Sequence, residues 1–331
     1  MPKQQPSRKN HGVQVHRVGG VEALEWGPTD IGGPAEHEAL IRQEAIGVNY
    51  IDVYHRTGLY PLPLPLIPGI EGAGVVVAVG SAVADFEVGD RVAYGGVVGG
   101  YQELRLIPAD RLLKLPESIS FDVAAAMMLQ GMTAQVLLTQ VYKVRRGDTI
   151  LVHAAAGGTG LILCQWASSL GATVIGTVSS EEKAETARAH GCTHPVIHSA
   201  EDFVQRVAEI TNGRKLPVVY DSIGRDTFLR SLDCLAPRGL MVSFGQASGA
   251  VPPLDVTVLA QKGSLYLTRP SVFTFIKERQ QLVSVFENVL EKVTSGAVRV
   301  GVNHRYALRD AAQAHRDLEA RKTTGPVILV P

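Results

Sequence analysis

HAAAGGTG, at residues 153–160, is the stretch that decides the fold. It follows an apolar run of strand length and opens an apolar segment predicted to be a helix, residues 159–170. Gly157 would let the backbone approach a pyrophosphate, and Gly160 would let the helix pack closely on the strand. The amino terminus of the helix adds free N–H groups and a favourable dipole for phosphate. The turn therefore predicts a dinucleotide site, although Ala154 replaces the usual first glycine.

Strand and helix patterns alternate on both sides of this turn. Short apolar runs predict strands at 149–154, 173–178, 195–198, 218–221 and 240–244, with 265–268 as a candidate sixth. Helices are predicted at 159–170, 180–190, 199–212 and 226–235, the third starting at Ser199 with Asp202 as its capping partner. Repeated βαβ units with buried strands imply an α/β fold, a doubly wound parallel sheet of the Rossmann type.

The chain before about Ala125 has a different texture, rich in Gly, Pro and Val. Its short strands are predicted at 13–15, 39–42, 74–79, 91–93 and 104–106, and its best helix at 49–57, ending at Gly58. This pattern predicts a β-rich domain. Near the carboxyl end we expect one long amphipathic helix, 275–295, a short one, 310–321, and a terminal strand, 327–330, able to pair back onto the first domain.

The end of the second strand of the parallel sheet bears on the choice between NAD and NADP. An NAD site usually has an acid there for the ribose 2′-OH, but this strand ends with residues 176–180, GTVSS. Two hydroxyls, with Lys183 one turn further on, suit a 2′-phosphate. The alternative is that Ser179 or Ser180 merely caps the next helix and Lys183 is a solvated charge. The local chemistry favours NADP(H).

Bulk properties exclude several classes of protein. The 331 residues suit two domains, and 32 basic against 32 acidic side chains predict no strong attraction to nucleic acid or anionic membranes. No apolar run is judged long enough to cross a bilayer, and the polar segment 1–10 does not resemble a secretory signal. Cys164, Cys192 and Cys234 are too few for a disulfide framework, which favours the cytoplasm. Cys164 is expected in the core.

Six segments together extend over most of the chain and resemble one family. They are NYID (49–52), PGIEGAGV (68–75), VGDRV (88–92), HAAAGGTG (153–160), YDSIG (220–224) and TRP (268–270). On these motifs the chain resembles the quinone oxidoreductase (zeta-crystallin-like) family of the medium-chain dehydrogenase/reductase superfamily. The resemblance implies a GroES-like catalytic domain, 1–126 completed by 271–331, and a Rossmann NADPH-binding domain, 127–270. It also implies NADPH as reductant, a quinone as substrate and a homodimer.

The resemblance also implies site residues. Asn49, Tyr50 and Ile51 would border the nicotinamide and the substrate, and Ser179 and Lys183 would hold the 2′-phosphate. The other residues expected in the cofactor groove are Gln130, Gly157, Gly158, Thr159, Gly160, Thr177, His198, Ser222, Phe244, Gly245, Thr268, Arg269 and Arg321.

A zinc site is not expected. Zinc-dependent relatives use cysteine and histidine ligands, but Asn49 occupies the place of the first catalytic cysteine and Ile70 that of the histidine. The segment 94–104, where a four-cysteine lobe would lie, contains no cysteine. Without a Lewis acid, alcohol oxidation is difficult, whereas a quinone is already an electrophile. Tyr50 is then the candidate donor to a carbonyl oxygen, with Asn49 orienting it or the nicotinamide amide; a merely packed Tyr50 is the alternative.

Two other functions stay open at this point. The same scaffold resembles NADPH-dependent enone or alkenal reductases, which reduce an activated double bond. A non-enzymatic alternative is an NADPH-binding protein with an RNA-binding or crystallin-like role. Balanced charge and the absence of a basic stripe argue against nucleic acid as the main ligand.

Overall fold

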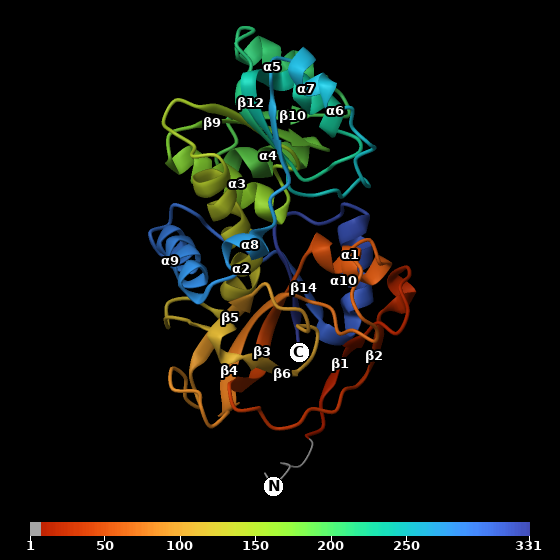
Figure 1. Ribbon diagram of the computed structural model, residues 1–331, viewed down its shortest axis with the longest axis vertical. Helices are drawn as coiled ribbons and strands as arrows, with labels where there is room; N and C mark the ends of the chain where they lie inside the picture. The colour runs from red at the N-terminus through yellow and green to blue at the C-terminus, as the bar shows by residue number, and fades with distance from the viewer. Residues whose placement is uncertain (1–7) are drawn as a thin grey trace. The chain divides into compact units, whose positions relative to one another are not determined.

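The computed structural model describes residues 8–331, which form two compact units (Figure 1). The first contains the described residues up to Met132 together with Glu278–Leu290 and Val300–Pro331. The second contains Thr133–Lys277 and Glu291–Arg299. These limits lie a few residues from the predicted boundaries, and the segment 291–299 groups with the second unit. The prediction that segment 1–10 is not a secretory signal concerns residues that lie mostly outside the described part of the chain.

The second unit is built on a six-stranded parallel sheet in the order β10-β9-β8-β11-β12-β13. The chain runs outward from β8 to β10, then returns to the other side of β8 and continues to β13, so the switch point lies between β8 and β11. This confirms the predicted doubly wound sheet and its sixth strand. The strands are β8 (Thr149–Val152), β9 (Thr173–Val178), β10 (His194–Ile197), β11 (Leu216–Asp221), β12 (Leu235–Ser243) and β13 (Tyr266–Thr268).

Helices accompany these strands, with two corrections to the predicted bounds. They are α3 (Gly158–Ser169), α4 (Glu181–Ala189), α5 (Phe203–Ile210), α6 (Phe228–Ser231) and α7 (Thr257–Gln261). The helix expected from Ser199 instead begins after Asp202, whose carboxylate accepts the first-turn N–H groups of Val204 and Gln205. The helix expected at 226–235 is short, and a 3₁₀ turn, η4 (Leu232–Cys234), leads directly into β12.

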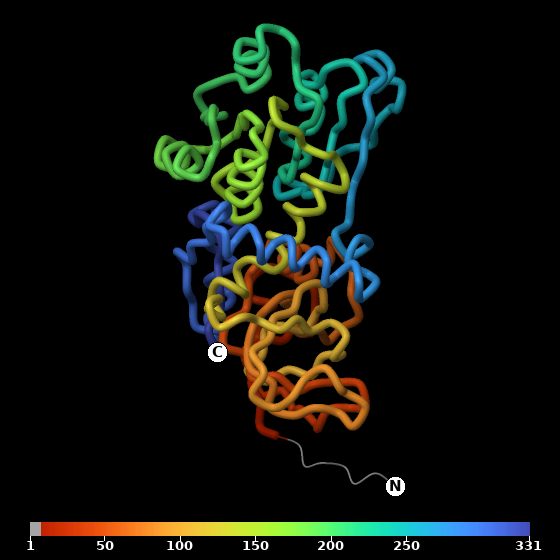
Figure 2. The backbone as a smooth tube through the Cα atoms, turned by 90° about the vertical axis from the view of Figure 1, so that its left-hand side faces the viewer, coloured from red at the N-terminus to blue at the C-terminus, as the bar shows by residue number. Residues whose placement is uncertain are grey.

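The first unit is β-rich, as predicted. Its seven-stranded sheet has the order β14-β15-β3-β4-β5-β7, with β6 also paired to β3, and β1 and β2 form a separate ribbon. The terminal strand β15 pairs antiparallel with β3, Val327 opposite Val48, which confirms the predicted return of the chain (Figure 2). The strands are β1 (His11–Gln14), β2 (Glu25–Pro28), β3 (Glu38–Val48), β4 (Glu71–Val79), β5 (Arg91–Gly95), β6 (Leu104–Pro108), β7 (Leu113–Lys114), β14 (His304–Ala307) and β15 (Val327–Val330).

The remaining helices include two departures from expectation. They are α1 (Tyr50–Thr57), α2 (Phe121–Val136), α8 (Val272–Phe275), α9 (Arg279–Thr294) and α10 (Ala311–Glu319). The long helix predicted at 275–295 is confirmed as α9, but it begins at Arg279, because the backbone at Ile276 leaves the helical region (φ −115°, ψ 19°) and ends the short helix α8. Helix α10 ends before Arg321, which adopts φ 59°.

The segment Phe121–Val141 corrects the statement that no apolar run could cross a membrane. It combines α2 with a π-helical turn, η3 (Leu137–Val141), and its 21 residues are long and apolar enough by length and composition. However, 78% of its most apolar window is buried inside the protein. Its Ala, Met and Leu side chains belong to the core, which is the ordinary environment of such a helix in a globular protein.

Candidate active site

The glycine turn lies at the carboxyl end of β8, beside the switch point of the sheet. A Cβ added at Gly160 would lie 2.2 Å from the carbonyl oxygen of Ala154, so this glycine is required for close packing of α3. At Gly157, the N-cap, an added Cβ would meet only the same oxygen, at 3.3 Å. Ala154 itself adopts φ 52°, which explains why glycine is usual there. The turn leaves its amide face open, as a pyrophosphate requires.

Two buried side chains hold this turn from behind. His153 is almost fully buried, with Nδ1 2.9 Å from the Thr177 hydroxyl and Nε2 2.8 Å from that of Ser231. Burial lowers the pKa of His153, which therefore stays neutral. The hydroxyl of Thr177, predicted to contact the cofactor, is thus directed to His153, and its carbonyl oxygen accepts from the N–H of Ala155. His153 and Thr177 support the turn.

The tip of β9 carries the residues predicted to select NADP. Ser180 caps α4, because its hydroxyl accepts from the N–H of Lys183 at 3.3 Å, so the capping alternative is confirmed for this serine. Ser179 and Lys183 are both half-buried, directly after the strand and in the first turn of α4. The acids of that turn, Glu181 and Glu182, are exposed. A hydroxyl and an ammonium group therefore lie together at the tip of β9.

Asp221, the last residue of β11, was missed by sequence reasoning. It is fully buried, and its Oδ1 accepts from the N–H groups of Ile223 (2.7 Å) and Gly224 (3.1 Å) and from the Thr227 hydroxyl (2.9 Å). These bonds shape the loop that contains Ser222. An acid at the end of an otherwise apolar strand was the available signal.

Further predicted cofactor residues gather at the same edge of the sheet. The Arg269 guanidinium donates to the Ser243 and Gly245 carbonyl oxygens, at 3.2 and 3.1 Å. A Cβ at Gly245 would lie 2.6 Å from the carbonyl oxygen of Ser222, so these two loops touch. Because carboxyl ends of parallel strands share one edge, the residues that follow or end the strands there lie together. They are Gly157, Gly158, Thr159, Gly160, Thr177, Ser179, Lys183, His198, Ser222, Phe244, Gly245, Thr268 and Arg269.

The first unit contains a buried polar chain around Asn49. This residue ends β3 and begins α1, and its Nδ2 donates to Oε1 of the fully buried Glu71. Oε2 of Glu71 accepts from the backbone N–H of Leu129 at 2.6 Å. Gln130 Nε2 donates to Asn49 Oδ1 at 3.3 Å. The structure thus brings two predicted residues, Asn49 and Gln130, into direct contact, and it joins Asn49 to an acid that was quoted in a motif but given no role.

Tyr50 and Ile51, the first residues of α1, are half-buried beside this chain. The Tyr50 ring lies 5.6 Å from that of Tyr54, which in turn lies 5.0 Å from the ring of Tyr60. Burial, and then the charge of Glu319, raise the pKa of Tyr50. The phenol therefore keeps its proton at neutral pH and can donate a hydrogen bond.

A second buried network lies under Tyr50. Asp52 is fully buried, and its Oδ2 accepts from the N–H of Asn49 at 2.8 Å and from the Tyr101 hydroxyl at 3.0 Å. The same hydroxyl lies 3.0 Å from His315 Nε2. Burial raises the pKa of Asp52 to about 7. The acid inside the NYID motif was the signal for this network.

The network continues to a buried arginine. Arg56 donates to both carboxylate oxygens of Glu319, at 2.7 and 3.0 Å, and lies 3.2 Å from His315 Nδ1. Burial, and then the charge of Arg56, lower the pKa of His315 to about 3. Arg321 follows α10. Its charge opposes the rise in the pKa of Tyr50, so these two predicted residues interact electrostatically.

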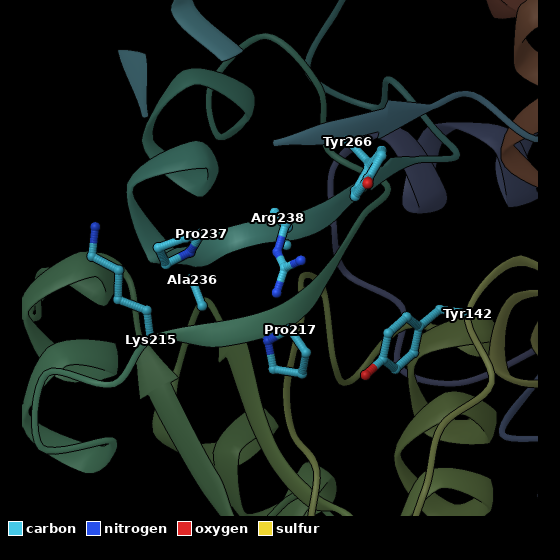
Figure 3. Close-up of a pocket in the computed structure, with 8 residues that line it drawn as sticks. Tyr142, Lys215, Pro217, Ala236, Pro237, Arg238 and Tyr266 are labelled. Atoms are coloured by element: carbon cyan, nitrogen blue, oxygen red, sulfur yellow. The ribbon is translucent and has the colours of Figure 1, made fainter. Parts of the chain in front are cut away.

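A cavity of about 470 Å³ lies elsewhere in the second unit (Figure 3). Its lining comes from the start of β11, the first half of β12 and the start of β13, the amino ends of these strands. Ligands of doubly wound sheets bind at the carboxyl ends. This cavity contains none of the predicted site residues, so it is not the cofactor site. Its lining residues are Tyr142, Lys215, Pro217, Ala236, Pro237, Arg238, Gly239 and Tyr266.

The two positions where zinc-dependent relatives are expected to have ligands are filled here by residues with other contacts. Asn49 is occupied by Glu71, and Ile70 is a buried core side chain. Over residues 8–331, no three His, Cys, Asp or Glu side chains are grouped to hold a metal ion. Cys164 is fully buried; its contact with Cys192, and then burial, raise its pKa well above the usual value, which confirms it as a core residue.

Two protein families match the two parts of the chain. Residues 35–117 match the alcohol dehydrogenase GroES-like domain, and residues 158–291 match a family described as zinc-binding dehydrogenase. The two matches correspond to the β-rich part and to the parallel sheet with its glycine turn.

Curated relatives and solved structures match almost the whole chain. A quinone oxidoreductase of Pseudomonas aeruginosa is 50% identical over 321 residues, 96% of this chain and 99% of that protein. A 2-haloacrylate reductase of a Burkholderia species is 44% identical over 96% of this chain and 98% of its own length. The crystal structure of Escherichia coli quinone oxidoreductase complexed with NADPH has a TM-score of 0.95 and 46% identity, over 97% of this chain and 100% of that one.

Proposed function

Since the chain belongs to the quinone oxidoreductase family of the medium-chain dehydrogenases/reductases, we propose that it is an NADPH-dependent quinone reductase. The observation that carries the proposal is the tip of β9. There, Ser179 and Lys183 stand at the end of a strand beside an open glycine turn, and no acid takes the place that a ribose 2′-OH would need. A relative that is 46% identical and covers 97% of this chain has been crystallised with NADPH.

The described residues fit such a cofactor. The Gly157–Gly160 turn would hold the pyrophosphate on the N–H groups of α3, and Ser179 and Lys183 would hold the 2′-phosphate. The loops shaped by Asp221 and Arg269 would line the rest of the groove. When bound, NADPH supplies the reducing electrons. The protein's own contribution is to bind, to orient and to exclude water.

Tyr50 is the proposed hydrogen-bond donor to the quinone oxygen. Its pKa is raised, so the phenolic proton is present throughout the neutral range. Donation to a carbonyl oxygen stabilises the negative charge that develops there during reduction. The Tyr50 ring packs against the buried ring of Tyr54, which packs against that of Tyr60, so aromatic contacts hold the phenol in place.

The proposed reaction needs no zinc. The support is the identity of Asn49 and Ile70 at the positions of two ligands, and the engagement of Asn49 by Glu71. Elemental analysis after purification without chelator should find far less than one zinc per chain. A stoichiometric zinc would contradict this part of the proposal.

A second candidate, reduction of an activated carbon–carbon double bond, is favoured by the 44% identity to a 2-haloacrylate reductase. Steady-state kinetics with NADPH across simple quinones, enones, alkenals and 2-haloacrylate distinguishes the two. We expect the highest kcat/KM with a quinone. A higher value with any of the alkenes would replace the first candidate by the second.

We also propose a cytoplasmic homodimer. The edge strand β13 leaves Tyr266 60% and Leu267 40% exposed, and such an edge is a template for pairing with a second chain. Three buried free thiols suit a reducing compartment. Light scattering on the purified protein should give twice the chain mass, and Leu267→Lys should reduce it to a monomer; a monomeric parent would contradict the proposal.

A further inference from the structure

Only one of the two polar atoms of the Gln130 carboxamide has a hydrogen-bond partner among the described residues. The residue is only 7% exposed, and Nε2 donates to Asn49. Oε1 is buried and has no hydrogen-bond partner among the residues that the structure describes. A buried acceptor without a donor is costly unless a ligand or water supplies one. Gln130 therefore presents a specific hydrogen-bond acceptor to whatever binds beside it.

Glu71, Asn49 and Gln130 form a chain of hydrogen bonds, and the protonation state of Glu71 at its inner end determines which amide atom Gln130 directs outward. An ionised Glu71 can only accept, so it takes the N–H of Leu129 and the Nδ2 of Asn49. Asn49 must then direct Oδ1 to Gln130. Gln130 donates from Nε2 to this oxygen, and its own Oε1 points away from Asn49. Each carboxamide has one donor end and one acceptor end. The orientation of Asn49 therefore determines the orientation of Gln130.

A neutral Glu71 reverses this order. Oε2 still accepts from Leu129, but the protonated Oε1 now donates to the oxygen of Asn49. Asn49 then turns its nitrogen to Gln130, which must accept with Oε1 and present Nε2 outward. One proton on Glu71 thus exchanges donor for acceptor at Gln130, and only two side-chain amides rotate.

We propose that Glu71 is a positioning residue whose protonation sets the direction of the chain Glu71–Asn49–Gln130 and thereby whether Gln130 offers its oxygen or its nitrogen to the nicotinamide carboxamide. The inference rests on the proposed contact of Gln130 with NADPH. The outward oxygen of the ionised state matches the amide N–H donors of a nicotinamide. The neutral state presents a donor at the same place, which opposes the N–H groups of a carboxamide that keeps this orientation and weakens the contact.

The surroundings of Glu71 make this change possible near neutral pH. Burial is the largest cause that raises the pKa of Glu71, to about 8. The carboxyl group is tightly enclosed, since a Cβ on Gly47 would lie 2.2 Å from Oε1. The two hydrogen bonds from Leu129 and Asn49 oppose the effect of burial. Burial and the opposing hydrogen bonds together thus bring the pKa of Glu71 up toward neutral pH.

Other titratable groups face Glu71 from the neighbouring elements. Asp52 on α1 raises the pKa of Glu71 by its charge. Tyr94 on β5 and Tyr101 in the loop after it have raised pKa values and stay neutral. Arg105 on β6 lies over the Tyr94 ring, 4.1 Å from its centroid. Asp52 is thus the neighbour whose own titration must be separated from that of Glu71.

The test compares two ligands between pH 6.5 and 9.5. NADPH carries the nicotinamide, whereas 2′,5′-ADP lacks it but shares the 2′-phosphate, so the ratio of their Kd values cancels the titration of that phosphate. In the parent protein we expect NADPH to gain about five- to tenfold over 2′,5′-ADP as pH rises through about 8, the contribution of one hydrogen bond. Calorimetry of both ligands measures the ratio.

Three variants isolate the chain. Glu71→Gln accepts from Leu129 and permanently donates to Asn49, so it should hold the low-pH ratio at every pH. Gln130→Leu removes the outer end of the chain and should also give a flat ratio. Asp52→Asn removes the neighbouring charge and should move the midpoint to lower pH while keeping the change.

Several outcomes would overturn the inference. A flat ratio in the parent protein with both ligands bound does so, and so does a Glu71→Gln protein that keeps the parental change. If Glu71→Gln does not fold, a pH-dependent ratio in Gln130→Leu has the same force. Failure of NADPH to bind the parent at any pH would instead refute the proposed function, and this inference with it.

Discussion

The glycine turn of the second unit and the Glu71 chain of the first unit hold their polar groups in opposite ways. The turn occupies eight consecutive residues and presents backbone N–H groups at the start of α3. The Glu71 chain joins side chains 22 and 81 residues apart, with a backbone group 58 residues away from the acid. One site is encoded by local spacing, and the other exists only after the sheet and α2 have come together.

The two regions therefore differ in what disturbs them. Backbone amides do not titrate, so the turn depends on geometry, above all on the space at Gly160. A buried carboxyl group depends on its protonation state, because the charged form has lost its water. We expect steric substitutions to damage the turn at any pH, whereas changes around Glu71 and Asp52 should show a pH dependence.

The largest effect is expected for Gly160→Ala. Its Cβ would lie 2.2 Å from the carbonyl oxygen of Ala154, and α3 would have to move. We expect a loss of about 1–3 kcal/mol of unfolding free energy and of most NADPH affinity. Urea unfolding and fluorescence titration measure both. Gly157→Ala is the matched control, since its nearest contact is at 3.3 Å; equal destabilisation of the two variants would contradict this packing argument.

Lys183→Ala tests the tip of β9. A charge-assisted hydrogen bond to a phosphate contributes about 1.5–3 kcal/mol, so kcat/KM with NADPH should fall about 10- to 100-fold. The value with NADH should stay the same, because that cofactor has no 2′-phosphate. Lys215→Ala, in the cavity at the amino ends of the strands, is the control. A parallel loss with both cofactors would show that Lys183 does not contact the 2′-phosphate.

Tyr50→Phe removes the proposed donor and keeps the ring. We expect kcat/KM for a quinone to fall about tenfold, since one hydrogen bond to the developing oxyanion is lost. The Kd of NADPH should change little. Stopped-flow and steady-state assays on the two proteins give the comparison, and an unchanged kcat/KM would remove Tyr50 from the reaction.

Asp52→Asn is expected to act through the pH dependence of stability. The folded-state pKa of Asp52, about 7, lies above its usual value of 3.8, so the folded protein binds the proton more tightly than the unfolded chain. Stability from this group is full below pH 4 and is lost as pH rises to about 7, at most about 1.4 kcal/mol per pH unit. The free energy of unfolding of the variant, measured with urea, should therefore increase relative to that of the parent between pH 4 and about pH 7. A constant difference would contradict the assignment.

Sequence reasoning succeeded where neighbours along the chain carry the information. The alternation of strands and helices after Asp148 predicted the doubly wound parallel sheet, and the apolar run 327–330 predicted the returning strand β15. It placed the start of the long helix at 275 instead of Arg279, because the chain leaves helical geometry at Ile276. Helix α5 was misplaced because one carboxylate, Asp202, satisfies the first-turn amides by itself.

The same division holds for the site. Asn49 and Gln130 could be named from the sequence, but the role of the acid that bonds to Asn49 could not, since Glu71 meets Leu129 only through the packing of α2 on β4. Asp221 is an exception to this division, because its three donors lie only two, three and six residues along the chain, in the loop that it shapes. A lone acid at either end of an apolar strand is the sequence signal that both residues share.

The most direct test of the proposed function is the ratio of kcat/KM for NADPH to that for NADH, with one simple quinone and enzyme dialysed against a metal chelator. With Ser179 and Lys183 at the tip of β9 and no acid there, we expect NADPH to be preferred by about tenfold or more, with full activity after dialysis. Equal or better turnover with NADH, or loss of activity with the metal, would contradict the account.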